Sequence, residues 1–371
     1  MKLETALIGL DQVALIPKSV SYVNSRKEVY PFDENGKLPV FVAPMTCITD
    51  TINYDLFNSK TYAVLPVFSN SSYLFDAIKL SDGWFAIPFD VFKKLTDNVN
   101  KIDDGHYYIC VDMADGHIGL LYEYVARFKK MYPNSKVMIG NIANSEAYRV
   151  CYDCGVDYVR VGIGGGNGCV TSVRTGFHNS IVNMLQEMNN IKQDILGGYC
   201  GGNKVPPKIV ADGGIDSIGK AIKCLALGAD YVMMGRLFAQ CDNSRGQKIY
   251  AQSVDDLRTK IDDPYAKISP ELEKKLNICE KLPDSNEVLV SEYYGQASEK
   301  GQIDRFGKVK SAPEGVTVYL PCEYTYTEFV GLFESYLRSA MSYNGSFDLE
   351  DFIGKVDWRE QSLAEFNSYN K

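Results

Sequence analysis

The feature that most constrains the fold of this 371-residue chain is an alternation of short β-branched runs with segments of helical periodicity. In the segments between the runs, apolar residues recur every three to four positions, as in Leu121, Val125 and Phe128. Parallel strands require crossover connections of this length, which are usually helices. The predicted strands are Val40–Ala43, Tyr62–Phe68, Trp84–Pro88, Tyr107–Asp112, Lys136–Asn141, Asp157–Gly162, Lys208–Asp212 and Asp230–Met234. We therefore predict an α/β fold, a closed (β/α)₈ TIM barrel, with an open doubly wound sheet as the alternative.

Polar residues and glycines follow many of these strands at their carboxyl ends. Asp112, Asn141, Asp212 and Arg236 lie there, and a glycine-rich loop from 162 to 168 leads into Cys169. In a barrel the carboxyl ends of all strands open on one face, where active sites are built. Glycines in βα turns would explain each position separately, but they do not explain a cysteine at the end of a five-glycine loop. We therefore expect an active site at this face.

The charge balance limits the classes of partner. The chain has 39 Lys and Arg against 47 Asp and Glu, a net charge of −8, and 45% of its residues are hydrophobic. This composition is that of a globular protein with a large core, not of a disordered chain or a disulfide scaffold. A basic surface for nucleic acid is not expected. Anionic small molecules remain compatible, because backbone N–H groups can bind them locally.

The cysteine pattern and the lack of long apolar runs predict a cytoplasmic protein with no membrane contact. Ten cysteines are scattered along the chain, mostly beside apolar residues, which is typical of reduced, buried thiols. No run of 18 apolar residues occurs, and the first residues lack the pattern of a signal peptide.

The segment 295–311 is polar, punctuated by glycine and without apolar periodicity. We interpret it as a mobile flap over the active site, with a static surface loop as the alternative. After it, a last helix is expected to pack against the barrel through one face, formed by Phe329, Leu332, Phe333, Tyr336 and Leu337.

The glycine loop before Cys169 is the strongest indication of chemistry. Glycines let backbone amides and carbonyls approach a ligand without a side chain in the way. A cysteine placed after them can be held against a substrate as a thiolate nucleophile, whereas a buried structural thiol is the alternative. Asp212 would suit a pair of ribose hydroxyls, and the ends of the last two strands suit a phosphate.

Ordered landmarks along nearly the whole chain resemble the IMP dehydrogenase/GMP reductase family. They are Asp11–Pro17, Ser25-Arg26, Ala43-Pro44-Met45, Asp112, Gly140-Asn141, the Cys169 loop, Ala211–Gly214, Gly235, Tyr293–Gly295, Ala312–Gly315 and Arg338–Gly345. The resemblance implies a single barrel domain over 1–371. Only about 45 residues separate Val64 from Asp112, so the regulatory insertion common in the dehydrogenases has no room.

The resemblance also implies roles for individual residues. Cys169 would be the nucleophile, and Thr171 with Glu314 would form a proton relay. Arg305 would be the base in the dehydrogenase reaction. The implied substrate, a purine nucleoside monophosphate, would be bound by Met45, Asn167, Asp212, Gly214, Gly235, Arg236, Tyr293, Gly295 and Gln296.

The implied cofactor is NADP or NAD, with its nicotinamide near Asp112 and Asn141 and with Gly162 and Gly164 beside it. A potassium ion is implied at the carbonyls of Gly164, Gly166 and Cys169. A homotetramer is implied because such flaps and loops are completed by a neighbouring subunit.

Two reactions remain open. The run Cys169–Gly176 and the short path from Gly295 to Glu314 resemble GMP reductase, which converts GMP to IMP and ammonia. Asp304-Arg305-Phe306 resembles the flap of IMP dehydrogenase, which oxidises IMP to XMP, with Phe in place of Tyr. We favour the reductase. A nucleotide-binding regulator without turnover is a third hypothesis, which the intact set of Cys169, Thr171 and Glu314 disfavours.

The phosphate site departs from the family pattern. Asn167 stands where the family has a phosphate-binding serine, and Arg236 replaces a second small contact residue. A guanidinium binds phosphate strongly, so Arg236 is expected to contact it. A related enzyme acting on a non-standard purine nucleotide therefore also remains open.

Overall fold

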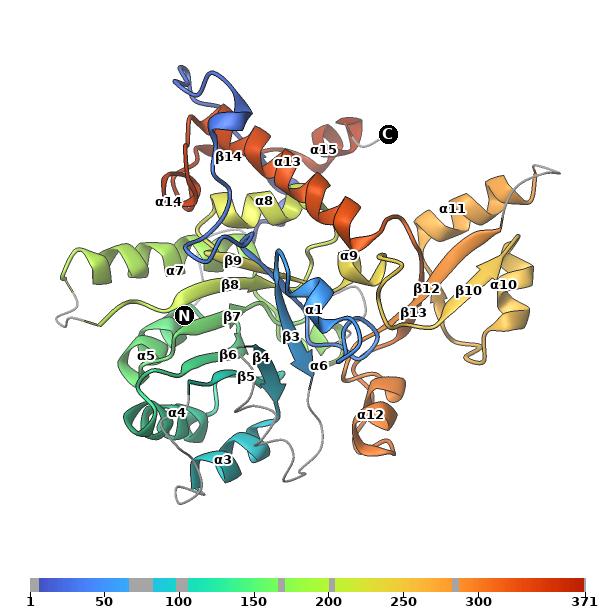
Figure 1. Ribbon diagram of the computed structural model, residues 1–371, viewed down its shortest axis with the longest axis horizontal. Coiled ribbons are helices and arrows are strands. Elements are labelled where there is room, and N and C mark those ends of the chain that lie inside the picture. The colour runs from blue at the N-terminus through green and yellow to red at the C-terminus, as the bar shows by residue number, and fades with distance from the viewer. Residues whose placement is uncertain are drawn as a thin grey trace.

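The computed structural model describes residues 7–66, 83–97, 106–165, 171–199, 204–281 and 287–369. Eight parallel strands close into a barrel in chain order, because β9 pairs with β2 (Figure 1). They are β2 (Val40–Val42), β3 (Tyr62–Pro66), β4 (Trp84–Ile87), β5 (Tyr108–Asp112), β6 (Lys136–Ile142), β7 (Tyr158–Val161), β8 (Lys208–Asp212) and β9 (Tyr231–Met234). The predicted TIM barrel is confirmed, and the closure excludes the open sheet.

Helices cover the outside of the barrel (Figure 1). The longer ones are α3 (Phe89–Asp97), α4 (Gly119–Met131), α5 (Glu146–Cys154), α7 (Ile181–Leu196), α8 (Ile218–Ala226) and α13 (Tyr326–Asn344). The shorter ones are α1 (Tyr54–Phe57), α6 (Thr171–Thr175), α9 (Arg236–Ala239), α14 (Leu349–Phe352) and α15 (Leu363–Tyr369). In α4 the predicted stripe of Leu121, Val125 and Phe128 is fully buried. None of the helices in the described part of the chain combines the length and apolar character that crossing a bilayer requires.

The predicted packing face of α13 is partly wrong. Phe329, Phe333 and Leu337 are buried, but Leu332 and Tyr336 are 42% and 54% exposed. A helix advances 100° per residue, so Leu332 and Tyr336 lie at the edge of the stripe formed by the other three residues. Of the predicted face, only Phe329, Phe333 and Leu337 are buried against the barrel.

An aromatic layer fills the amino-terminal end of the barrel. Phe41 on β2 contacts Tyr158 on β7 at 5.9 Å between ring centroids, and these strands are not neighbours, so both rings lie inside. The layer also includes Tyr62, Trp84, Tyr108 and Tyr231, each at the start of its strand. Below it, Asp33 accepts hydrogen bonds from the hydroxyls of Tyr62 and Tyr231. This end of the barrel is therefore filled with side chains.

A second, smaller sheet lies beside the barrel (Figure 1). Its strands have the order β10 (Lys248–Ala251), β12 (Val288–Tyr294), β13 (Thr317–Pro321) and β11 (Lys267–Ile268). Together with α10 (Val254–Lys260) and α11 (Pro270–Cys279) it encloses a separate apolar core that includes Leu257, Leu272 and Leu276. The sequence patterns did not predict this sheet, in which the two-residue strand β11 pairs with β13 across almost 50 residues of chain.

The chain from 295 to 311 contains a helix, α12 (Glu299–Phe306), where no periodicity was found. Ser298 caps its start by accepting the Gly301 N–H, and Gly307 ends it with a φ of +70°. Only Gly301 and Gln302 of its described side chains are buried, so the helix carries no apolar stripe to detect. The short strands β1 (Val13–Leu15) and β14 (Trp358–Glu360) pair antiparallel elsewhere.

Candidate active site

A pocket of about 390 Å³ opens at the carboxyl-terminal mouth of the barrel. This volume is in the range of sites for small organic ligands. Ends of the barrel strands form one wall, and the opposite wall comes from β12 and the chain that follows it. The lining includes Ala43, Met45, Asp112, Asn141, Arg160, Gly164, Thr171, Asp212, Gly214, Gly235, Arg236, Tyr293, Gly295, Gln296, Gln302 and Glu314. The site is thus where the strand ends predict it.

A buried arginine at the base of the pocket joins two carboxylates. The guanidinium of Arg160 donates from Nη1 to Asp112 Oδ1 at 2.5 Å and from Nη2 to Asp212 Oδ2 at 2.8 Å. Arg160 lies on β7 two residues after Tyr158, so its side chain points into the barrel just above the aromatic layer. Burial alone would lower the pKa of this guanidinium, but Asp212, Cys110 and Asp112 hold the pKa well above its ordinary value.

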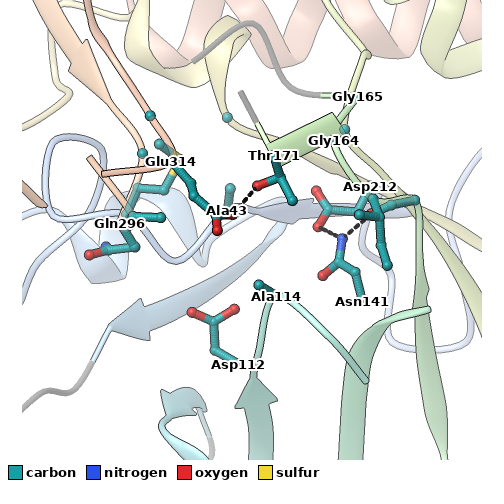
Figure 2. A pocket seen from close by; sticks show the side chains of 18 of the residues that line it. Ala43, Asp112, Ala114, Asn141, Gly164, Gly165, Thr171, Asp212, Gln296 and Glu314 are labelled. Carbon is teal, nitrogen blue, oxygen red and sulfur yellow. Dashed lines mark hydrogen bonds between the residues drawn. The ribbon is translucent and has the colours of Figure 1, made fainter. Parts of the chain in front are cut away.

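Asn141 completes this group from the neighbouring strand. Its Nδ2 donates to Asp212 Oδ2 at 2.8 Å and to the Gly162 carbonyl at 2.6 Å (Figure 2). Asp212 Oδ2 therefore receives N–H groups from both Asn141 and Arg160, whereas Oδ1 has no partner among the described residues. That oxygen is available to accept a hydrogen bond from a ligand hydroxyl.

Replacing Arg160 with methionine should lower the free energy of unfolding by about 3–5 kcal/mol, because two carboxylates would lose their buried partner. Urea unfolding measures this loss. Arg127→Met is the matched control, since Arg127 pairs with Asp97 while both are 49% exposed, and its cost should be below about 1 kcal/mol. Equal losses in the two variants would contradict the assignment.

Two residues far apart in the sequence meet across the mouth of the pocket. Thr171, the first residue of α6, donates from its hydroxyl to Glu314 Oε2 at 2.6 Å (Figure 2). In the view of Figure 2, Thr171 lies between Glu314 and the pair of Asn141 and Asp212, with its hydroxyl toward Glu314. A hydroxyl hydrogen-bonded to a carboxylate can pass a proton in either direction.

The position of Glu314 depends on Gln302, which is 3% exposed. Gln302 Oε1 accepts the N–H groups of Lys310 and Ser311, and its Nε2 donates to the Ser311 carbonyl at 3.1 Å. The chain three residues later brings the Glu314 N–H to the Ala297 carbonyl at 2.9 Å. Gln302 thus holds the segment that leads to Glu314 beside α12 through hydrogen bonds to Lys310 and Ser311.

Asp304 and Lys300 hold α12 against the smaller sheet. Tyr294 donates to Asp304 Oδ2 at 2.6 Å and Thr46 donates to the same oxygen at 3.2 Å. Lys300 pairs with Glu292 at 2.6 Å, and the Glu292 side chain is 5% exposed. Both contacts lie in the segment that we interpreted as a flap; its mobility stays a prediction.

Glycines allow the walls of the pocket to approach one another. A Cβ on Gly235 would lie 3.1 Å from the Tyr293 hydroxyl and 3.2 Å from the Met45 sulfur, so these three residues share one wall. Gly162 has a φ of +126°, and a Cβ there would meet the Asp212 carbonyl at 2.2 Å. Gln296 donates from Nε2 to the Pro44 carbonyl, while its Oε1 has no hydrogen-bond partner within the described part of the chain.

Arg236 is turned toward the smaller sheet. Its side chain is 10% exposed, and Nη2 donates to Glu271 Oε2 on α11 at 2.8 Å. Its other N–H groups have no partner among the described residues. Arg236, which is predicted to contact the phosphate, is therefore paired with a carboxylate in this structure.

Some predicted site residues cannot be placed. Gly166, Asn167 and Cys169 lie outside the described residues, and nothing is described of the Arg305 side chain, whose backbone belongs to α12. The carbonyl of Gly164, predicted to bind potassium, accepts the Ser172 hydroxyl at 3.2 Å. The remaining predicted residues all line the pocket.

Three residues of this region, Arg160, Gln302 and Glu271, are not indicated by the motifs of the sequence. A charged residue two positions after an inward-facing aromatic residue on a strand is a detectable signal for Arg160, because side chains alternate along a strand. No comparable signal exists for the other two, which act through contacts that only the fold creates.

The model of the IMP dehydrogenase/GMP reductase domain matches residues 89–259. A GMP reductase of Helicobacter pylori strain G27 is 28% identical over 369 residues, covering 96% of this chain and 97% of that protein. A GMP reductase of Enterococcus faecalis is 27% identical over 372 residues, with 96% and 97% coverage.

The chain belongs to the IMP dehydrogenase/GMP reductase family. An inosine-5'-monophosphate dehydrogenase of Chlorobaculum parvum matches a shorter stretch, 38% identical over 148 residues that cover 40% of this chain and 28% of that protein. The family and these relatives make this protein an oxidoreductase that acts on purine nucleotides.

Proposed function

We propose that this protein is a GMP reductase, which converts GMP to IMP and ammonia. The observation that carries the proposal is the hydrogen bond between Thr171 and Glu314 at the mouth of the pocket. It supplies a fixed proton relay, which the loss of ammonia requires. GMP reductases matching almost the full length of the chain support the same reaction.

In the proposed reaction the Cys169 thiolate adds to C2 of the purine, forming the C2–S bond. The amino group at C2 takes a proton through Thr171 and Glu314 and leaves as ammonia, which gives a thioimidate at C2. A nicotinamide cofactor supplies a hydride to C2 when it is bound. The C2–S bond then breaks, and IMP and the Cys169 thiolate are released.

Donors and acceptors in the pocket fit both ligands. Asp212 Oδ1 accepts from a ribose hydroxyl, while Arg160 and Asn141 hold the other oxygen. Asp112 and Asn141 each keep one oxygen without a partner among the described residues, and these acceptors suit the amide N–H groups of a nicotinamide. Gly162 and Gly164 would let the backbone approach it.

The dehydrogenase reaction is the second candidate, favoured by the 38% identity to an IMP dehydrogenase over 148 residues. Cys169 would add to IMP, hydride would leave to NAD, and water would hydrolyse the thioimidate to XMP. Arg305 would then be the base that activates water, with Thr171 and Glu314 as another route for the proton.

Two parallel assays test the proposal. GMP with NADPH should consume reduced cofactor and release ammonia in equal amounts, whereas IMP with NAD should give no XMP. Turnover with IMP and NAD alone would make the protein a dehydrogenase. Turnover of neither standard nucleotide, with tight binding, would indicate a regulator without turnover or an enzyme that acts on a non-standard purine nucleotide. Repeating the GMP assay with NADH in place of NADPH tests the cofactor preference. Repeating it without potassium tests whether the enzyme requires that ion.

A homotetramer is part of the proposal, since the flap and the glycine loop of such barrels are completed by a neighbouring subunit. Light scattering gives the mass directly, and a monomer would contradict this part.

Arg236→Ala should raise KM for the nucleotide, with a loss of about 2–3 kcal/mol in binding free energy, the scale of a hydrogen bond to a charged group. The matched control is Arg245→Ala, because Arg245 also pairs with a carboxylate, Asp50, but does not line the pocket. Steady-state kinetics measure both. An unchanged KM in a folded Arg236→Ala variant would show that its guanidinium does not reach the phosphate.

A further inference from the structure

Arg236 stands at the place in the barrel where phosphate is commonly bound. It begins α9, one residue beyond the end of β9, the last barrel strand, and lines the pocket with Gly214 and Gly235. In many TIM barrels the loops after the last two strands hold the phosphate of the ligand. With its side chain 10% exposed and its other N–H groups unpartnered among the described residues, this guanidinium can take an anion from the pocket.

Glu271 already occupies one edge of that guanidinium. It reaches Arg236 from α11, which belongs to the smaller sheet, at 2.8 Å. Glu271 is 58% exposed, unlike its partner, so the carboxylate can leave the pair without losing its hydration. An ion pair with one solvated member contributes little to stability.

We propose that Glu271 is an internal competitor of the substrate phosphate for Arg236 and thereby moderates the affinity for phosphorylated ligands. Phosphate carries more charge than a carboxylate and can take two parallel N–H groups of the guanidinium. A ligand with a phosphate replaces Glu271, whereas a nucleoside leaves the pair intact and gains nothing at this end. The inference rests on the proposed function in that it takes the ligand to be a purine nucleoside monophosphate.

The Glu271 carboxylate remains stabilised after it leaves Arg236. Glu271 is the second residue of α11, whose start is capped by Ser269, and negative charge near the start of a helix is stabilised by its dipole. The exchange therefore costs little on the side of the smaller sheet. The free-energy difference between Arg236 paired with Glu271 and Arg236 paired with a ligand is therefore set mainly by the contacts that the ligand makes with Arg236.

Calorimetric titration of the full chain with GMP, IMP, guanosine and inosine tests this inference. Glu271→Gln should tighten binding of both nucleotides about three- to fivefold, because a weak competing ion pair is removed, and it should leave binding of the nucleosides unchanged. In the Arg236→Ala background the same substitution should have no effect on nucleotide binding. Glu273→Gln is the matched control, since Glu273 is exposed on the same helix and does not line the pocket.

Each other outcome overturns the inference. Weaker nucleotide binding by Glu271→Gln would mean that Glu271 orients Arg236 for the ligand. An equal effect on nucleosides, or an effect that persists without Arg236, would remove the link to phosphate, and a failure of the wild type to bind either nucleotide would remove its basis. The titration needs no turnover. Phosphate-dependent binding without reduction of GMP would therefore refute the reductase and leave the competition standing.

Discussion

Cys169→Ser should abolish turnover while leaving nucleotide binding within about tenfold of the wild type. The proposed reaction needs a covalent bond to C2, which serine cannot form at a useful rate without a strong base. Ground-state binding comes instead from phosphate and ribose contacts, which the substitution does not touch. Turnover assays and calorimetric titration with GMP measure the two quantities separately.

Cys154→Ser is the matched control, because Cys154 lies on α5 outside the pocket, and it should retain full activity. Substantial turnover by the Cys169→Ser variant would rule out both covalent mechanisms.

Glu314→Gln should lower kcat on the order of 10²-fold or more, the scale of a lost acid–base group. The amide keeps the shape of the side chain and can still bond to Thr171, but it cannot accept and return a proton. Arg305→Ala should cost less than about tenfold in kcat, because a fixed relay needs no base that arrives later on a flap. Single-turnover kinetics with GMP and NADPH compare the two.

Glu323→Gln serves as the control, since Glu323 pairs with Lys275 away from the pocket. A collapse of activity in Arg305→Ala, with Glu314→Gln nearly normal, would reverse the preference and indicate the dehydrogenase. The comparison separates the reactions because hydrolysis of a thioimidate requires a water-activating base, whereas reductive deamination does not.

The barrel was predictable because each of its strands is a short apolar run bounded by polar or glycine residues. That pattern follows directly from burial on both faces of a parallel sheet. Thr171 and Glu314, 143 positions apart, were paired in advance only through resemblance to a family. Nothing in the composition or spacing of the chain alone joins them.

The smaller sheet and the contacts of Gln302, Arg160 and Glu271 could not be predicted for a related reason. Strand β11 has only two residues, which leave no periodicity to detect, and it pairs with β13 across almost 50 residues of chain. The guanidinium of Arg160 meets carboxylates 48 and 52 positions away, and only closure of the barrel brings these together. Polar contacts between residues so far apart in the sequence leave no periodic pattern of the kind that helices and strands produce.

The aromatic layer above Asp33 fills the amino-terminal end of the barrel, whereas the pocket opens at the carboxyl-terminal mouth. In the proposed reaction, substrate and cofactor would both enter and leave by this mouth, and the ligand that lies deeper would arrive first and depart last. Ammonia formed in the proposed reaction would also diffuse out past whatever still occupies the mouth. The order of events in a catalytic cycle would thus be set by a group of tyrosines, a tryptophan and a phenylalanine that never touch the reacting atoms.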